Sequence, residues 1–466
     1  MYRTDPISTV AAVSTPRGKG GIAVIRISGA DTVCILEKCF VPKGAPLKER
    51  PYRTAVYGDI LSGGEIIDSG ICTLYEEGRS FTGESMAEIS CHGGIWVTRA
   101  VLEAVLSAGA EAAGPGEFTR RAFINGKLTL SEAEAVGTLI DADTRSRAAM
   151  AAGAVRGNVT AAIKEIDELL LDNLTALYAA IDYPDEDVGT RGEDWILWCV
   201  VQCLEKLDRL RRSYKTGRAV ADGIKTVICG RPNVGKSSLY NLLLGEERAI
   251  VTDVAGTTRD TLEDTVDVGG VTLRLLDTAG IRETDDKVEK LGVERAYSKL
   301  EEAELIICVF DAYERLNDDD YALIEKLKTL PCEKISVENK LDISKGVGAS
   351  LCDSIMRSSF TENVVALSAK TGEGKEELER LIAGLYNEDS LDLSSDAVIW
   401  SAAQKASLDR AYDLLSSAKE ALVASSPLDA VGVICEEALS ELRMVDGRNV
   451  SQDIIDGIFS KFCVGK

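Results

Sequence analysis

The stretch KTVICGRPNVGKSSL, residues 225–239, constrains the fold of this chain more than any other. An apolar run typical of a β-strand leads directly into glycine-x-x-x-x-glycine-lysine-serine, and a helical pattern follows. In that setting, backbone N–H groups surround a phosphate and the N-terminus of the helix adds its dipole. Lys236 is then placed to reach the β and γ phosphates, and the Ser237 hydroxyl to bind Mg²⁺. The motif predicts a nucleotide-binding α/β domain.

Two further motifs predict the groups around the metal and the γ phosphate. GTTRD (256–260) offers Thr258 to complete the Mg²⁺ shell. The strand-like VTLRLLDTAG (271–280) carries Asp277, which would act on Mg²⁺ indirectly, through another ligand or a bound water, and Gly280, which would meet the γ phosphate. Together with the phosphate loop, these motifs predict a site for a nucleoside triphosphate with Mg²⁺.

The motifs NKLD (339–342) and SAK (368–370) predict which base is bound. The Asp342 carboxylate can accept hydrogen bonds from the N1–H and N2 amino groups of guanine, and adenine has no such donors on that edge. SAK would close over the base. Because all these motifs occur in the order that GTPases have, they predict a GTPase domain. The predicted GTP-binding residues are Asn233, Val234, Gly235, Lys236, Ser237, Ser238, Thr252, Asp253, Val254, Ala255, Gly256, Thr257, Thr258, Asp277, Thr278, Ala279, Gly280, Asn339, Lys340, Asp342, Ser368, Ala369 and Lys370.

The residue that follows DTAG is Ile281, where Ras-like proteins carry a glutamine that orients the attacking water. Catalysis must therefore use another group. The acids nearby are Glu283, Asp285, Asp286 and Glu289, and spacing alone does not choose between them or distinguish them from solvated surface charges. Asn233 has two interpretations as well: it shapes the turn of the phosphate loop, or its side-chain oxygen binds a monovalent cation beside the phosphates.

The character of the sequence changes along the chain and predicts its domains. Residues 1–125 combine glycines with short apolar runs, which predicts an α+β domain. Residues 221–385 alternate strand and helix patterns, as parallel α/β sheets do, whereas 126–220 and 386–466 are helical. The simplest arrangement is one helical domain interrupted by an inserted α/β domain. In the first domain, strands are expected at 21–28, 53–60, 69–75 and 86–94.

Helix signals locate the ends of several helices. Ser131 and Glu134 form a capping-box pattern that predicts one long helix through 132–152. The last residues follow an amphipathic pattern, and burial of its apolar face predicts that the chain end is docked instead of frayed. The residues of that face are Val450, Ile454, Ile455, Ile458, Phe459 and Phe462.

The composition narrows the class of protein. Charged residues make up 28% of the chain and no apolar run approaches the ~18 residues of a spanning helix, so no membrane association is expected. The opening MYRTDPISTV lacks the pattern of a signal peptide, which predicts a cytoplasmic protein. Twelve cysteines without any C-x-x-C spacing, and a single histidine, predict reduced thiols and not zinc or disulfides. That histidine, His92, is interpreted as a packed or turn residue.

The formal net charge of −23 argues against broad binding of nucleic acid. An RNA substrate would need a local basic patch or a basic partner.

With these residues in view, the chain resembles the tRNA-modification GTPase family MnmE, also called TrmE. The resemblance extends beyond the GTPase motifs and nearly spans the chain. It is carried by STPRGKGGIAVIRISG (14–29), SFTGESMAEISCHGG (80–94), PGEFTRRAFINGKLTLSEAEAVGTLIDA (115–142) and the terminal FCVGK (462–466).

The resemblance implies a multidomain α/β protein. Residues 1–125 would form an N-terminal α+β folate-binding and dimerisation domain, and 126–220 with 386–466 a discontinuous helical domain ending in the CVGK tail. A Ras-like P-loop GTPase domain, 221–385, would be inserted between them. It also implies a K⁺-stimulated GTPase that forms a homodimer and a heterotetramer with the flavoprotein GidA, also called MnmG. That complex would add an aminomethyl or carboxymethylaminomethyl group to C5 of the wobble uridine of certain tRNAs.

The implied cofactors are GTP, Mg²⁺, K⁺ and 5,10-methylene- or 5-formyl-tetrahydrofolate. Mg²⁺ would be held by Ser237 and Thr258, and Glu289 would position the attacking water. The implied K⁺ ligands are Asn233, Thr252, Val254 and Thr257. The implied folate-binding residues are Arg26, Glu88, Lys127 and Lys466. Cys463 would lie near the carbon chemistry, either as a reacting nucleophile or as a packed thiol.

Two other classes of function are consistent with parts of the sequence. One is a ribosome-assembly or translation GTPase that acts as a switch, against which the N-terminal domain and the FCVGK tail argue. The other is a folate-dependent one-carbon transferase that GTP merely regulates and that acts on a protein or metabolite.

Overall fold

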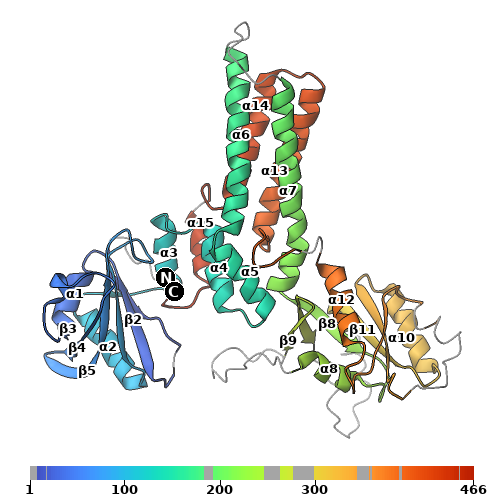
Figure 1. Cartoon of the computed structure of the whole chain (residues 1–466), viewed down its shortest axis with the longest axis horizontal. Helices are drawn as coiled ribbons and strands as arrows, with labels where there is room; N and C mark the ends of the chain where they lie inside the picture. Colours follow the sequence, from blue (N-terminus) through green and yellow to red (C-terminus); the bar gives the residue numbers. More distant parts are fainter. Residues whose placement is uncertain are drawn as a thin grey trace. The chain divides into compact units, whose positions relative to one another are not determined.

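The chain folds into two compact units, residues 1–137 with 443–466 and residues 138–442 (Figure 1). The computed structural model describes residues 8–16, 18–182, 193–245, 263–276, 299–343, 356, 359–387, 391–450 and 452–465. Among these residues, none of the helices is both long and apolar enough to cross a membrane.

A seven-stranded mixed sheet with the order β3-β4-β5-β6-β2-β1-β7 forms the centre of the first unit. Its strands are β1 (Val10–Val13), β2 (Ile22–Ser28), β3 (Phe40–Pro42), β4 (Ala55–Ser62), β5 (Glu65–Tyr75), β6 (Met86–His92) and β7 (Glu111–Ala112). The four predicted strands correspond to β2, β4, β5 and β6, so those predictions are confirmed. The helical segments of this unit are α1 (Thr32–Cys39), η1 (Leu47–Glu49), α2 (Ile95–Ser107), α3 (Glu117–Ile124), α4 (Leu130–Ile140) and α15 (Gln452–Phe459).

The two faces of this sheet differ because side chains alternate along a strand. On β2, Ala23, Ile25 and Ile27 are buried and join one hydrophobic core with residues of α1 and α2, such as Leu36. Arg26 lies on the opposite face. Helices α1 and α2 thus cover one face of the sheet, and the opposite face carries Arg26 and a second, smaller hydrophobic core that includes Phe118.

The predicted capping box at Ser131 and Glu134 is wrong by two residues. The pair that caps α4 is Thr129 and Glu132: the Thr129 N–H donates to Glu132 Oε2 at 2.9 Å, and the Glu132 N–H donates to Thr129 Oγ1 at 3.3 Å. Ser131 is buried, and its hydroxyl donates to the carbonyl of Val445 at 2.8 Å. The Ser131 hydroxyl is therefore used in a tertiary hydrogen bond and, contrary to the local pattern, does not cap the helix.

The single helix predicted over 132–152 is two helices. α4 ends at Ile140, and α5 (Arg145–Val155) begins after a short connection. The cause lies in Thr144, whose extended backbone (φ −124°, ψ 155°) lets its side chain accept a hydrogen bond from the Arg147 N–H. A short polar side chain that binds the backbone in this way starts a new helix in place of continuing the old one.

Four long helices of the second unit run side by side (Figure 1). They are α6 (Asn158–Asp182), α7 (Glu193–Ala221), α13 (Ala402–Val423) and α14 (Leu428–Val445). Buried apolar residues such as Leu170, Leu207 and Leu415 come from three of these helices. Polar contacts supplement the packing, because the buried Asn173 side chain donates to the Ile196 carbonyl at 2.7 Å.

The α/β part of this unit is a six-stranded sheet with the order β13-β12-β11-β8-β10-β9. Its elements are β8 (Ile224–Cys229), α8 (Lys236–Leu244), β9 (Glu263–Val268), β10 (Val271–Leu276), β11 (Leu305–Asp311), α10 (Asp318–Thr329), β12 (Glu333–Asn339), β13 (Val364–Ala366) and α12 (Lys375–Tyr386). Five strands are parallel, as expected, but the edge strand β9 is antiparallel to β10. A hairpin through Gly269 and Gly270, with φ 60° and 84°, produces that reversal.

The β9–β10 hairpin also binds the start of α5. The Ser146 N–H donates to Asp267 Oδ2 at 3.0 Å, and the Thr144 and Thr272 hydroxyl oxygens lie 3.1 Å apart. An aspartate carboxylate at a helix N-terminus satisfies a free N–H group and complements the helix dipole. The α/β sheet is thereby fixed to the helical part of the same unit.

The chain end is docked, as predicted, and it packs within the first unit. α15 (Gln452–Phe459) is shorter than predicted, so Val450 and Phe462 lie outside the helix and not on its face, which corrects the prediction. Phe462 still packs against Phe459, with ring centroids 5.4 Å apart. The Gly116 N–H donates to the carbonyl of Cys463 at 3.2 Å, and the Ser14 hydroxyl donates to that of Gly465 at 2.9 Å. The tail is held by backbone groups as well as by apolar contacts.

Candidate functional site

The predicted phosphate loop has the strand–loop–helix context that the motif requires. Gly230 follows β8 with φ 137°, and Gly235 precedes α8 with φ 101°, both unfavourable for other residues. Lys236 is the first residue of α8. Its ammonium donates to the Arg231 carbonyl at 2.8 Å, and burial lowers the pKa of Lys236. Ser237 and Ser238 follow at the helix N-terminus, where a bound phosphate is stabilised.

Asn339 connects the phosphate loop to the predicted base-binding loop. Its side chain is 2% exposed. The side-chain amide donates to the Val234 carbonyl at 2.9 Å, and its oxygen accepts from the Ala369 N–H at 2.9 Å. A Cβ atom at Gly235 would lie 2.1 Å from the Asn339 side-chain nitrogen. Glycine is therefore required where these two loops meet.

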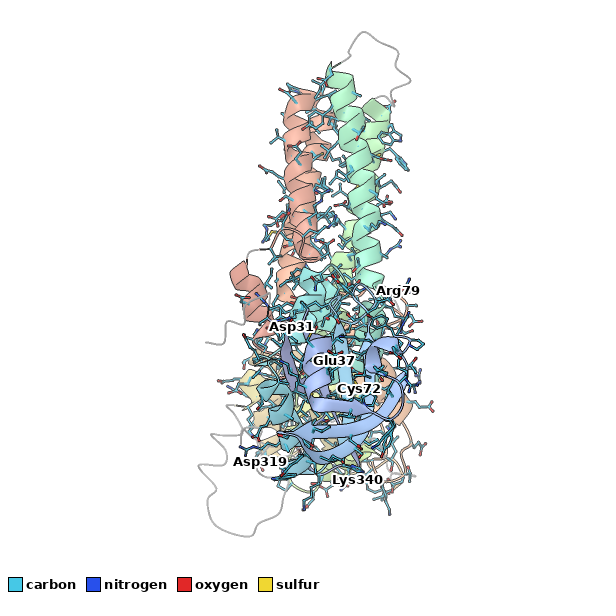
Figure 2. The ribbon with its side chains drawn as sticks, turned by 90° about the vertical axis from the view of Figure 1, so that its left-hand side faces the viewer. Asp31, Glu37, Cys72, Arg79, Asp319 and Lys340 are labelled. Carbon is cyan, nitrogen blue, oxygen red and sulfur yellow. The ribbon has the colours of Figure 1, made fainter. Side chains whose placement is uncertain are left out.

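The two predicted base-reading motifs contact each other through Asp342 and Ser368. The buried Ser368 hydroxyl donates to Asp342 Oδ1 at 2.7 Å. Lys340, labelled in Figure 2, has a left-handed backbone with φ 74°, and its ammonium lies 2.6 Å from Asp311 Oδ2. Burial acts to raise the pKa of Asp311, but contacts with Lys340 and the Tyr313 N–H outweigh it and hold that pKa below its usual range. Asp342 is thus positioned as an acceptor on a fixed loop.

Asn233 also has a left-handed backbone, with φ 64°. Asparagine tolerates this conformation better than most residues, which agrees with a role in shaping the turn. Its side chain is exposed, and none of the described residues forms a hydrogen bond with it. The side-chain oxygen is therefore also accessible to a cation, and both interpretations stand.

Several predicted residues lie outside the described part of the chain. They are Thr252, Asp253, Val254, Ala255, Gly256, Thr257, Thr258, Asp277, Thr278, Ala279, Gly280, Ile281, Glu283, Asp285, Asp286, Glu289 and Lys466.

The first unit contains a pocket of about 350 Å³ that includes two of the predicted folate-binding residues. Arg26 and Glu88 are cross-strand neighbours on β2 and β6. The Arg26 guanidinium donates to Glu88 Oε1 at 2.8 and 3.1 Å and lies 5.4 Å from the ring centroid of Phe81. Tyr75 donates to Glu88 Oε2 at 3.3 Å. We call this site the Arg26 pocket.

The third described folate-binding candidate, Lys127, does not line the Arg26 pocket. Its ammonium donates to the Gly78 carbonyl at 3.0 Å, within the segment that precedes Arg79 and Phe81. The lining residues that sequence reasoning missed are Arg53, Tyr75, Arg79, Phe81, Met86, Thr119 and Val136. They come from separate segments, and no spacing in the sequence links them.

His92 and Cys463 are both exposed. The His92 side chain is 75% exposed and His92 is the last residue of strand β6, so the packed and the turn interpretations are both wrong. Its Nδ1 lies 2.7 Å from Asp68 Oδ1. Asp68 also accepts the His92 backbone N–H at 2.8 Å. Cys463 is exposed next to its backbone bond with Gly116, which leaves the thiol accessible.

Glu134 on α4 provides a test of stability against pH. Burial raises the pKa of Glu134 to about 7, and the nearby Lys461 opposes this shift. The neutral carboxyl therefore stabilises the fold below the unfolded pKa of about 4.5, and this stabilisation is lost as the pH rises through 7. Glu134→Gln stays neutral, so its free energy of unfolding should exceed that of the wild type by roughly 2 kcal/mol above pH 8.

Urea unfolding of both proteins between pH 4.5 and 8.5 measures this difference. The two curves should converge near pH 4.5, and an equal difference at every pH would contradict the shifted pKa.

Family models match both units of the chain. The GTP-binding protein TrmE N-terminus model matches residues 9–127, and the MnmE helical domain model matches residues 130–463. The second match contains the α/β sheet between its helical parts. The chain belongs to the MnmE family. Curated MnmE relatives, named tRNA modification GTPase MnmE, extend the match over the full length. The Clostridioides difficile protein is 38% identical over 98% of this chain and 99% of its own length. The Symbiobacterium thermophilum protein is 39% identical, with the same coverage.

Proposed function

We propose that the chain is a GTPase that acts in tRNA modification. In this proposal, a GTPase domain at 221–385 is inserted into a helical domain formed by 126–220 and 386–466, after a folate-binding and dimerisation domain at 1–125. Mg²⁺ and K⁺ assist GTP hydrolysis in a cytoplasmic homodimer. That homodimer joins the flavoprotein GidA in a heterotetramer and uses a one-carbon tetrahydrofolate. The product is an aminomethyl or carboxymethylaminomethyl group on C5 of the wobble uridine.

The observation that carries the GTPase role is the contact between the three nucleotide motifs. Asn339 is bonded to both the phosphate loop and the SAK loop, and Ser368 orients Asp342. These contacts support the proposal that Asp342 accepts hydrogen bonds from guanine while the glycine-rich loop binds the phosphates. The role in tRNA modification is supported by relatives of that name that match over the full length.

The folate role is supported by the Arg26 pocket. Its volume of about 350 Å³ suits a small ligand, and Glu88 beside Arg26 can accept hydrogen bonds from an amino-substituted ring. The net charge of −23 supports the dependence on a basic partner, because an acidic chain binds the phosphates of tRNA weakly by itself.

Mass spectrometry of tRNA nucleosides from a deletion strain tests the function. Loss of C5-modified wobble uridines, restored by the intact gene, is expected. Unchanged nucleosides together with defective ribosomal subunits would favour the ribosome-assembly GTPase and contradict the proposal. Unchanged nucleosides with altered methylation or formylation of a protein or metabolite would favour the transferase.

Potassium dependence tests the proposed role of Asn233. Because Ile281 occupies the position of a water-orienting glutamine, we expect hydrolysis to be roughly 10–100-fold faster in K⁺ than in Na⁺, as electrostatic stabilisation of the phosphates allows. Asn233→Ala should remove this difference.

Glu289→Ala should slow hydrolysis by a similar factor while nucleotide affinity stays nearly unchanged.

Asn233→Gly is the matched control for backbone strain. Since φ is 64°, alanine is strained at this position and glycine is not, yet both lack the side-chain oxygen. K⁺ stimulation should therefore be lost in both variants. Stimulation that survives in Asn233→Gly would assign Asn233 to the turn alone.

A further inference from the structure

The charges that line the Arg26 pocket are not balanced. Three lining residues are arginines, and Glu88 is the only acidic one among them. Arg26 is paired with Glu88, and Arg79, labelled in Figure 2, is 65% exposed and lies 3.7 Å from Glu76. Arg53 forms no ion pair with any of the described residues. The excess of positive charge favours a ligand with a negatively charged group.

Arg53 also has an unfavourable backbone conformation. Its φ is 62°, and the Arg53 N–H donates to the Leu74 carbonyl at 2.7 Å, which holds the chain in that conformation. Non-glycine residues with such backbones concentrate at binding sites. Four are found in the described part of the chain, and two of them, Asn233 and Lys340, belong to the predicted nucleotide site.

Thr119 on α3 is a buried polar group without a partner. Thr119 is 0% exposed, and its Oγ1 forms no hydrogen bond within the described part of the chain. An unsatisfied buried hydroxyl is costly, and native structures usually pair such groups with protein, water or ligand. Because Thr119 lines the Arg26 pocket, a bound ligand is placed to supply the missing partner.

We propose that Thr119 and Arg53 are two further ligand-binding residues of the Arg26 pocket, which takes a reduced pterin with a carboxylate tail. The proposal rests on the folate role stated above. Thr119 is buried and hydrogen-bonds the ring, next to the apolar surfaces of Phe81 and Met86. Arg53 is exposed and pairs with a tail carboxylate that keeps contact with water.

Calorimetric titration of the full-length protein with 5-formyl-tetrahydrofolate tests both residues. Thr119→Val should weaken binding about tenfold, whereas Thr119→Ser, which keeps the hydroxyl, should bind like the wild type. Without ligand, Thr119→Val should unfold at the same or a higher temperature, because it removes an unsatisfied buried hydroxyl. A purely structural threonine would instead lower the unfolding temperature.

Arg53→Gln should also weaken binding about tenfold. With a tetrahydropterin that lacks the carboxylate tail, Arg53→Gln and the wild type should bind equally, while Thr119→Val should remain weaker. Arg99→Gln is the matched control, because Arg99 is an exposed arginine on α2 that does not line the pocket.

The titrations distinguish a failure of the folate role from a failure of the assignment of Thr119 and Arg53. If the wild type fails to bind 5-formyl-tetrahydrofolate, the folate role itself is wrong and this proposal is wrong with it. If the wild type binds and both variants keep its affinity, only the assignment of Thr119 and Arg53 is overturned. If one variant alone keeps wild-type affinity, that residue is removed from the site.

Discussion

Asp342→Asn is expected to weaken GTP binding on the order of 10²-fold or more and to favour xanthine nucleotides. The carboxylate would accept two donors from guanine, and an asparagine amide replaces one acceptor with a donor. Xanthine has a carbonyl in place of the N2 amino group, so the new donor finds a partner. The contact of Asp342 Oδ1 with the Ser368 hydroxyl survives the change, because an amide oxygen also accepts.

Fluorescence titration with labelled GDP and with xanthosine diphosphate measures the switch. Asp319→Asn is the control, because Asp319 is an exposed carboxylate on α10 of the same α/β part, labelled in Figure 2. It should keep the wild-type preference. An unchanged preference for guanine in Asp342→Asn would refute the assignment of the base site.

The described part of the nucleotide site was predictable because its motifs are local. The glycines at 230 and 235 and the helix that starts at Lys236 are specified within one short segment. The sequence did not predict that Asn339 bonds both loops, because that role depends on contacts across 105 and 30 residues of sequence. The antiparallel β9 was missed although VGGV, with two glycines between alternating residues, is a hairpin signal.

The sequence contains two patterns that fit a capping box, and tertiary packing determines which of them forms. Thr129–Glu132 and Ser131–Glu134 both fit a capping box, and burial of Ser131 leaves the first pair to cap α4. The Arg26 pocket could not be predicted as a set, because its residues come from three strands, two loops and two helices. Only the register of β2 and β6 brings Arg26 and Glu88 together.

Removal of residues 462–466 is expected to abolish tRNA modification and to weaken folate binding, while GTP hydrolysis stays within about twofold of the wild type. The tail is bound to the first unit through the Cys463 and Gly465 carbonyls and the Phe462 ring. The nucleotide motifs belong to the other compact unit, so they lose no contact inside their own unit. Nucleoside mass spectrometry and phosphate release measure the two activities separately.

Gly465→Ala tests docking without removing any side chain. Gly465 has φ 97°, and an added Cβ would lie 2.2 Å from the Val13 carbonyl oxygen, so the tail must shift. Modification should fall in this variant as in the truncation. A truncated protein that modifies tRNA at the normal rate would exclude the tail from the site.

Cys463→Ser then separates the two roles of the thiol. Serine keeps the size and lowers the nucleophilicity, so a reacting thiol predicts a loss of about 10²-fold or more in modification, because a hydroxyl at neutral pH is a far weaker nucleophile. A thiol that takes no part in the chemistry predicts activity near that of the wild type. Because Cys463 is exposed, the substitution leaves no buried cavity that would confuse the result. Cys34→Ser is the control, since Cys34 is also an exposed cysteine of the first unit, and it should leave modification unchanged.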